Sequence, residues 1–134
     1  MSPSTPIRIA AGIITDREGH ILLVRKRGTS FFMQPGGKLT EGESPVETLA
    51  RELVEELGCT LLRSEFLGTF CAPAANEPQH TVEALLFCAE IAGHVQPRAE
   101  IEEITWVEPS RTGGLRLAPL TRDHVLPLVL ARGL

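Results

Sequence analysis

Apolar residues occur in short runs separated by polar turns through the first third of the chain. Residues 7–15 are apolar and β-branched, residues 16–19 have turn composition, and residues 21–24 are again apolar. Runs of this length, bounded by turn residues, are typical of buried strands. We therefore predict a β-hairpin that feeds a buried sheet. Residues 31–37 follow as a strand end or loop, whose glycines give the backbone freedom.

An apolar period of three to four residues then predicts an α-helix over residues 45–57. Ser44 is a suitable N-cap, Glu47 completes a capping box, and Gly58 suits the left-handed conformation that ends many helices. The expected buried side of the helix consists of Val46, Leu49, Ala50, Leu53 and Leu57.

The rest of the chain returns to strand patterns before a final helix. Residues 61–72, 81–92 and 104–107 are predicted strands. Residues 121–132 are a predicted helix, with Thr121 as its cap and Pro127 as an unfavourable interior residue. Strands on both sides of a central helix favour an α/β class, and 134 residues fit one domain over residues 1–134.

Composition and charge narrow the classes of function. The net charge of −4 argues against a nucleic acid polymer as the main partner, although a bound cation still allows a small phosphate ligand. No secretory signal and no bilayer-spanning apolar run is visible, so no membrane association is expected. Three widely spaced cysteines, Cys59, Cys71 and Cys88, suit a reducing compartment, and the expected location is cytoplasmic.

Three glutamates lie on one side of the predicted helix. At about 100° per residue, Glu52, Glu55 and Glu56 face away from the apolar stripe and within reach of one another. Crowded carboxylates repel, and a hard cation such as Mg²⁺ or Mn²⁺ removes that repulsion because it prefers oxygen ligands. Arg51 can pair with Glu43 and fix its carboxylate. From these residues alone, a metal site and a solvated acidic surface are equally compatible with the pattern.

A longer motif favours the metal site. Gly37, Glu43 and the run Arg51-Glu52-Leu53-Val54-Glu55-Glu56-Leu57-Gly58 have the spacing of the Nudix box. The chain resembles the Nudix hydrolase family at every charged and glycine position of this box. It differs at Cys59, where the family has a bulky aliphatic residue. The segment just ahead of the box, from Phe32 to Lys38, also looks like the family's usual approach.

The resemblance implies an α/β/α sandwich with a mixed β-sheet and a loop–helix–loop metal platform. It implies Mg²⁺, with Mn²⁺ as a substitute, held by the catalytic residues Glu52, Glu55 and Glu56 and by the Gly37 carbonyl. Glu52 or a glutamate of a later loop is the expected base for the attacking water. Glu43 and Arg51 would be structural orienters. Dimers are common in the family, so a homodimer is compatible with the resemblance.

Further site residues are expected outside the box. Glu100 and Glu103 precede a strand and are candidates for the loop glutamate that completes such a metal site. Arg25, Arg27 and Lys38 are candidates for phosphate contact, and Phe32 for contact with the base. Each of these residues is also compatible with an ordinary surface or core position.

The resemblance indicates a pyrophosphohydrolase that cleaves a phosphoanhydride bond in a small nucleoside diphosphate derivative. The favoured substrate is a (d)NTP, including oxidised or non-standard ones, with release of NMP and pyrophosphate. The alternative is an ADP-ribose or nucleotide-sugar pyrophosphatase, for which Pro73 lies near the expected register. A diadenosine polyphosphate substrate is disfavoured because the chain has no Tyr. A catalytically silent nucleotide-binding regulatory domain is the alternative of another class, and the intact box glutamates count against it.

Overall fold

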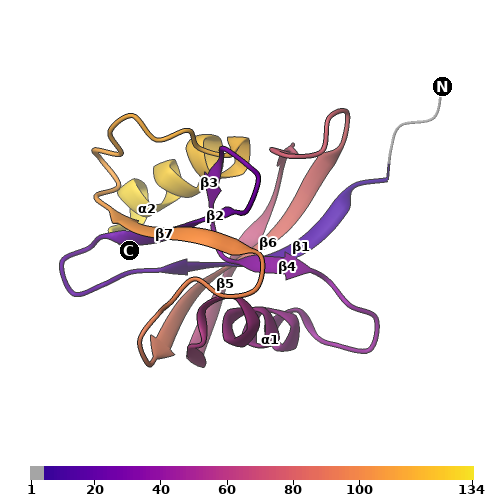
Figure 1. Ribbon diagram of the computed structural model, residues 1–134, viewed down its shortest axis with the longest axis horizontal. Coiled ribbons are helices and arrows are strands. Elements are labelled where there is room, and N and C mark those ends of the chain that lie inside the picture. Colours follow the sequence, from indigo (N-terminus) through magenta and orange to yellow (C-terminus); the bar gives the residue numbers. More distant parts are fainter. Residues whose placement is uncertain (1–4) are drawn as a thin grey trace.

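The computed structural model describes residues 5–134 and arranges them as two β-sheets between helices (Figure 1). One sheet has the order β4-β1-β6-β5 and the other β3-β2-β7. The strands are β1 (Ile7–Ile14), β2 (Ile21–Lys26), β3 (Phe32–Met33), β4 (Gly36–Lys38), β5 (Thr60–Pro73), β6 (Thr81–Ala92) and β7 (Ile101–Val107). The helices are α1 (Pro45–Leu57), a π-helical turn (Thr121–Val125) and α2 (Leu126–Arg132). The parallel pair β1–β6 and the antiparallel pairs β1–β4 and β5–β6 make the first sheet mixed, as expected for the α/β sandwich.

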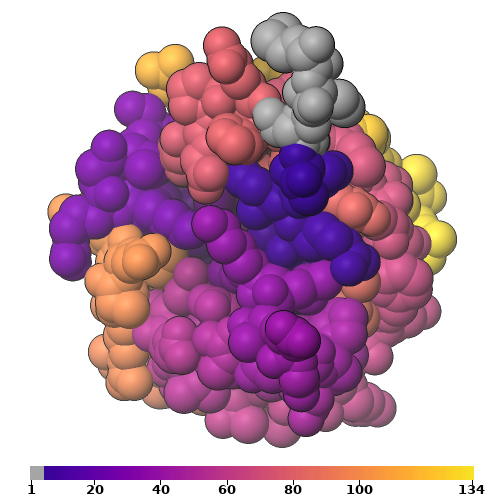
Figure 2. Space-filling view, turned by 90° about the vertical axis from the view of Figure 1, so that its right-hand side faces the viewer, coloured from indigo at the N-terminus to yellow at the C-terminus, as the bar shows by residue number. Residues whose placement is uncertain are grey.

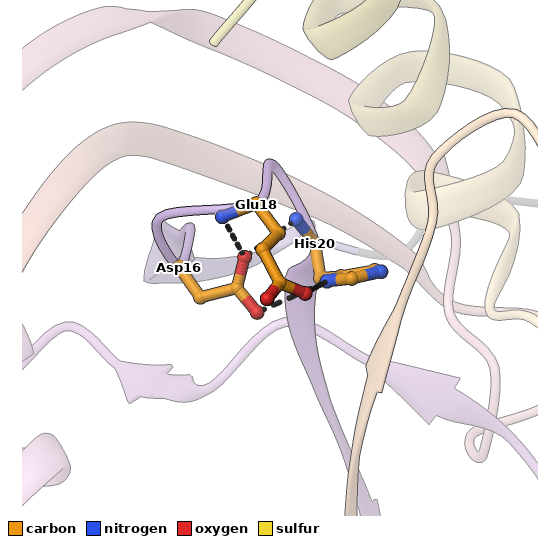
Figure 3. A group of neighbouring side chains, drawn as sticks. All are labelled: Asp16, Glu18 and His20. Atoms are coloured by element: carbon orange, nitrogen blue, oxygen red, sulfur yellow. Dashed lines mark hydrogen bonds and ion pairs between the residues drawn. The ribbon is translucent and has the colours of Figure 1, made fainter.

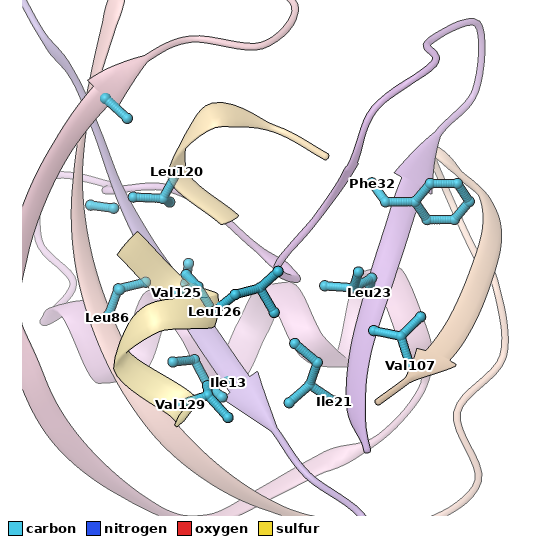
Figure 4. Close-up of a cluster of buried hydrophobic side chains, with 13 residues drawn as sticks. Ile13, Ile21, Leu23, Phe32, Leu86, Val107, Leu120, Val125, Leu126 and Val129 are labelled. Atoms are coloured by element: carbon cyan, nitrogen blue, oxygen red, sulfur yellow. The ribbon is translucent and has the colours of Figure 1, made fainter. Parts of the chain in front are cut away.

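The helices cover apolar layers on different sides of the sheets. Between α1 and the sheets, Leu49, Leu53 and Leu57 are fully buried in one cluster with Leu22 and Phe87. On the side of α2, a second cluster joins the two sheets to the C-terminal segment, as Figure 4 shows. These layers fix α1 against the first sheet, which sets the position of its polar face.

The predicted boundaries of α1 are confirmed. The Ser44 side chain accepts a hydrogen bond from the backbone N–H of Glu47 at 3.1 Å, and Glu47 Oε1 accepts one from the Ser44 N–H at 2.8 Å. Gly58 ends the helix with φ at 69°. The prediction that Val46 is buried is wrong. This residue lies in the first turn of α1, is 39% exposed and is absent from the cluster between α1 and the sheets. Cys59 is buried in that cluster, where a small apolar side chain fits.

The predicted hairpin is wrong beyond its turn. Thr15 and Ile21 form an isolated bridge, after which β1 pairs with β4 and β6 while β2 pairs with β3 and β7. Residues on both faces of β1 and β2 are buried. Hydrophobic pattern therefore marks each segment as a strand without indicating which partner it pairs with. Strand β7 also begins three residues earlier than predicted, at Ile101.

The C-terminal helix differs from its prediction at its start. Thr121 lies within a π-helical turn, and its hydroxyl donates to Gln34 instead of capping the helix. The N–H of Leu126 bonds to the carbonyl of Thr121, five residues back. This wider turn directly precedes Pro127, which occupies the first turn of α2, where a missing N–H is tolerated. Of the predicted single domain over 1–134, residues 1–4 lie outside the described part of the chain.

Candidate active site

The polar face of α1 borders a hollow that we call the acidic cavity. Its walls come from β2, β4 and the residues just after it, the second half of α1, the loop between β5 and β6, and the loop before β7. The lining residues with charged side chains are Lys26, Lys38, Arg51, Glu52, Glu55, Glu56, Glu77 and Glu100. The structure thus brings together the three box glutamates and one candidate loop glutamate from a distant part of the sequence.

One of these carboxylates, Glu56, is buried, and a second, Glu52, is partly buried. Glu56 is 6% exposed, and its Oε1 accepts a hydrogen bond from the Gly36 N–H at 3.3 Å. Burial raises the pKa of Glu56 to about 7, with the Gly36 hydrogen bond opposing the shift and the nearby Glu52 adding to it. Burial also raises the pKa of Glu52, although the charge of Arg51 opposes this. Carboxylates at such a position favour a bound cation, because it stabilises their charged form.

Arg51 connects the acidic residues to the loop before α1. Its Nε donates to Glu43 Oε2 at 2.9 Å and its second terminal nitrogen to Glu43 Oε1 at 3.1 Å, which is a bidentate pair. The other terminal nitrogen reaches Glu52 at 3.2 Å and Glu55 at 3.3 Å. The Thr48 hydroxyl also donates to Glu43. Arg51 therefore restricts the orientation of three carboxylates at once, those of Glu43, Glu52 and Glu55.

The two glycines of β4 permit close packing against the helix. Gly36 has φ at 152°, and a Cβ there would overlap the Ala10 carbonyl of the neighbouring strand. A Cβ at Gly37 would overlap the carboxyl group of Glu52. The backbone of β4, including the Gly37 carbonyl proposed as a ligand, therefore lies directly beside the α1 carboxylates.

Backbone hydrogen bonds place Glu100 in the acidic cavity. The Arg98 N–H donates to the Glu56 carbonyl at 2.8 Å, and the Arg27 N–H donates to the Glu100 carbonyl at 2.7 Å. These bonds dock the loop on the end of α1 and the end of β2. Glu103 lies elsewhere: it accepts from Arg25 Nε at 3.0 Å and lines neither this cavity nor the apolar cavity described below. Of the two candidate loop glutamates, the structure therefore places only Glu100 among the box carboxylates.

The candidate substrate residues are distributed unevenly. Lys38 lines the acidic cavity. Arg27 lines the apolar cavity while pairing with Glu102, and Arg25 pairs with Glu103. Phe32 is 6% exposed and packs in the core on the side of α2, which corrects its assignment to the base. A phenylalanine is equally typical of a core position and of a base-binding position, so the sequence alone did not distinguish them.

Sequence reasoning did not single out Lys26, Glu77 or Gln34, all of which line one or both cavities. Lys26 lies within a basic run, and only the fold places this lysine, rather than its neighbours Arg25 and Arg27, in the lining of the acidic cavity. Glu77 lies on a loop whose path depends on the pairing of β5 with β6. Gln34 is the one polar residue in the segment 31–37, and a polar residue in an apolar segment is a weak indication of a functional role.

A second hollow, the apolar cavity, continues from the acidic one. It has a volume of about 550 Å³, within the range of small-molecule sites. Its apolar wall consists of Ile7, Ile9, Ala11, Val24, Met33 and Val82. Glu56, Glu100, Lys26 and Lys38 line both cavities. Figure 2 views this side of the molecule, with α1 below the start of β1 and the β5–β6 loop. The joined cavities suit a molecule with one apolar end and one charged end.

A separate polar group lies at the turn between β1 and β2 (Figure 3). Asp16, Glu18 and His20 offer ligand atoms within 4.8 Å of one another. Asp16 already accepts hydrogen bonds from the N–H groups of Glu18 and His20 at 2.9 Å, which is the usual way an aspartate closes a turn. None of the three residues lines either cavity. This group is accounted for as turn structure.

Comparison with known proteins places the chain in a family. The family model of the NUDIX domain matches residues 5–129. A putative 8-oxo-dGTP diphosphatase of Bacillus subtilis is 31% identical over 101 residues, covering 74% of this chain and 64% of that protein. An 8-oxo-dGTP diphosphatase of Haemophilus influenzae is 41% identical over 68 residues, covering 48% of this chain and 50% of that protein. The chain thus spans between about half and two thirds of the length of these relatives.

A solved structure and a further relative agree with this placement. The structure of MutT studied in Aliivibrio salmonicida and Vibrio cholerae has a TM-score of 0.75 and 26% identity, covering 96% of this chain and 99% of that one. An ADP-ribose pyrophosphatase of Methanocaldococcus jannaschii is 26% identical over 119 residues, covering 87% of this chain and 68% of that protein. Between Thr5 and Leu134, no helix is long and apolar enough to cross a membrane. With the box glutamates gathered at one cavity and the NUDIX model spanning nearly the whole chain, this protein belongs to the Nudix hydrolase family, with MutT-like proteins among its relatives.

Proposed function

We propose that this protein is a Mg²⁺-dependent pyrophosphohydrolase that cleaves a nucleoside triphosphate, including oxidised forms, to the nucleoside monophosphate and pyrophosphate. The observation that carries the proposal is the junction of the two cavities. Carboxylates and lysines suited to a metal-bound polyphosphate line one end, and an aliphatic wall suited to a base lines the other. The relatives named 8-oxo-dGTP diphosphatases support the triphosphate as substrate.

The residues present fit a divalent cation. Glu52, Glu55, Glu56 and Glu100 supply hard oxygen ligands around one hollow, and the Gly37 carbonyl is a further candidate. The burial of Glu56 and Glu52 is unfavourable for their charges unless a cation compensates it. When bound, Mg²⁺ neutralises polyphosphate charge and lowers the pKa of a coordinated water.

The chain itself would perform the remaining tasks. Lys26 and Lys38 carry positive charge into the same hollow and would bind the phosphate oxygens. Glu52 or Glu100 would accept the proton of the attacking water, a role that depends on position more than on intrinsic basicity. Arg51 and Glu43 would hold Glu52 and Glu55 in their orientation. The water oxygen bonds to one of the two phosphorus atoms of the α–β anhydride as the bridging oxygen leaves with the other, so that the products are the monophosphate and pyrophosphate.

A panel of substrates tests the proposal. Wild-type protein with Mg²⁺ is given GTP, dGTP, 8-oxo-dGTP, ATP, ADP-ribose and a UDP-sugar. Product is measured as phosphate, which an added pyrophosphatase releases for the triphosphates and an added phosphatase releases for ADP-ribose and the UDP-sugar. We expect triphosphates to be the best substrates and Glu55→Gln to lose roughly a hundredfold or more of the turnover. Glu47→Gln is the matched control, since Gln also serves at this position of a capping box.

The outcomes separate the alternatives. Preferred turnover of ADP-ribose or the UDP-sugar would replace the triphosphate with the second substrate class, which the Methanocaldococcus jannaschii relative and Pro73 at the end of β5 favour. If no member of the panel is hydrolysed and Glu55→Gln equals the wild type, the enzymatic proposal is wrong.

A further inference from the structure

Gln34 is a buried polar residue whose hydrogen bonding is incomplete. It lies between β3 and β4 and is 6% exposed. Its Oε1 accepts a hydrogen bond of 2.6 Å from the Thr121 hydroxyl, whereas its Nε2 has no hydrogen-bond partner. Among residues 5–134, Nε2 of Gln34 is the one buried side-chain nitrogen or oxygen in this condition. Buried donors nearly always have a partner, so this one points to a partner that a ligand supplies.

Thr121 determines which end of the amide is available. The threonine is fully buried and starts the π-helical turn Thr121–Val125. Single π-helical turns are rare and occur often at functional sites. Because the hydroxyl of Thr121 is directed to Oε1, the amide group presents its nitrogen as the unused donor. The two residues are 87 positions apart in the sequence, so the contact exists only in the folded protein.

The location of Gln34 matches the base end of the proposed substrate. Gln34 lines the apolar cavity together with Val24 and Met33, and it directly precedes the Pro35-Gly36-Gly37 turn that leads to the carboxylates. The lining of this cavity contains no aromatic residue in the described chain, so ring stacking is not available there. A base in this cavity would contact mainly aliphatic groups, which hold it without fixing its edge, and the other uncharged polar side chains of the lining, Thr29 and Asn76, lie on loops. A buried amide supplies the missing direction.

Contact with Nε2 requires a side-chain adjustment, because this atom is shielded from water. Met33 lines the same cavity and is only partly buried. Methionine has three rotatable bonds and adapts readily to a ligand. Met33 is therefore a neighbour in the cavity lining that can adapt when a ligand reaches Gln34.

We propose that Gln34 is a specificity-determining residue whose Nε2 donates a hydrogen bond to an acceptor on the base, either an exocyclic carbonyl oxygen or an unprotonated ring nitrogen. This inference rests on the proposed function, which supplies the nucleoside triphosphate. Thr121 is a positioning residue that orients the amide. A site built around a buried hydrogen bond discriminates strongly, because a ligand without the acceptor leaves the donor unpaired.

The test compares a nucleoside triphosphate with a triphosphate that lacks a base. Steady-state kinetics are measured with the best nucleotide of the panel and with 1,2-dideoxyribose 5-triphosphate. We expect Gln34→Met to lose roughly tenfold to a hundredfold of kcat/KM on the nucleotide, mainly through KM, and less than about twofold on the base-free substrate. Thr121→Val, which keeps the shape but removes the hydroxyl, shifts the nucleotide KM in the same direction.

Two further variants control for structure and for the direction of the hydrogen bond. Gln96→Met changes an exposed glutamine that lines neither cavity and leaves both substrates unaffected. Gln34→Glu keeps the shape but removes the donor, so it loses at least as much nucleotide activity as Gln34→Met. Because Gln34→Met also removes the acceptor of the buried Thr121 hydroxyl, the melting temperatures of Gln34→Met and of the double variant Gln34→Met/Thr121→Val are measured, and all kinetics are compared at a temperature where each variant is folded.

Binding measurements separate this inference from the proposed function. Calorimetry with a non-hydrolysable nucleoside triphosphate and with tripolyphosphate measures the contribution of Gln34 to binding affinity even if turnover is absent. The inference requires Gln34→Met to weaken the nucleotide roughly tenfold and to leave tripolyphosphate unchanged. Equal losses on the base-containing and base-free ligands would assign Gln34 a structural role only. An active Gln34→Glu beside an inactive Gln34→Met would overturn the donor assignment. Wild-type protein that binds no nucleotide would overturn both proposals.

Discussion

Gly37 and Glu52 are in such close contact that residue 37 has no room for a side chain: a Cβ there would overlap the Glu52 carboxyl group. The contact joins β4, through its pairing with β1, to the polar face of α1. A glycine at this position is therefore explained by the approach of a carboxylate, and the backbone at Gly37 needs no left-handed conformation.

Gly37→Ala should impair hydrolysis while preserving the fold. The new methyl group would displace the Glu52 carboxyl, and a displacement of about 1 Å in such a site typically lowers the rate by roughly a hundredfold. Rates are compared under saturating Mg²⁺ and nucleotide, with circular dichroism as the check on folding. Gly114→Ala is the matched control, because Gly114 has ordinary backbone angles and open space around its Cα. Equal activity of the two variants would contradict the role assigned to the Gly37–Glu52 contact.

The raised pKa of Glu56 predicts a pH-dependent metal affinity. Burial raises this pKa to about 7 in the metal-free protein, whereas its ordinary value is 4.5. The carboxylate form that binds a cation therefore becomes dominant only as the pH passes about 7. We expect Mn²⁺ affinity, measured by calorimetry, to rise roughly tenfold between about pH 6 and pH 8. In Glu56→Gln the affinity should be weaker and should lose most of this dependence.

The same shift predicts the opposite trend for stability without metal. A carboxyl group with a raised folded-state pKa stabilises the protein fully below its unfolded pKa and loses that contribution as the pH rises toward the folded value. The metal-free wild type should therefore lose stability relative to Glu56→Gln between the ordinary pKa of 4.5 and about 7. The free energy of unfolding of each metal-free protein is measured by urea denaturation at several pH values in this range. The same pH dependence in both proteins would show that Glu56 is not the titrating group.

Phe32 should matter for stability and little for the substrate. It is buried against the α2 side of the core and lines neither cavity. Phe32→Ala should lower the free energy of unfolding by about 3–5 kcal/mol, measured by urea denaturation. At a temperature where the variant is folded, its KM should stay close to that of the wild type. Phe66→Ala, at a residue that is 55% exposed, provides the comparison. A raised KM with unchanged stability would restore Phe32 to the base site.

The sequence predicted most where local rules apply. The capping box at Ser44 and the glycine at 58 define α1 without reference to the rest of the chain, and the box spacing indicates which carboxylates share its polar face. It predicted less where partners are distant in sequence. The separation of β1 and β2 into different sheets, the pairing of Glu103 with Arg25 and the bond from Thr121 to Gln34 all depend on tertiary packing. The substrate end of the site is built from such contacts, which is why pattern alone did not locate it.

The central claim, that the carboxylates of α1 bind the metal on which hydrolysis depends, is tested most directly by Mn²⁺ titration followed by electron paramagnetic resonance. Wild-type protein, Glu52→Gln, Glu56→Gln and the control Glu47→Gln are titrated at a pH above 7, where the Glu56 carboxyl is charged. We predict that both α1-face variants weaken Mn²⁺ binding by roughly tenfold or more, with unchanged circular dichroism, and that the control binds like the wild type. Unchanged Mn²⁺ affinity in Glu52→Gln and Glu56→Gln would contradict the claim.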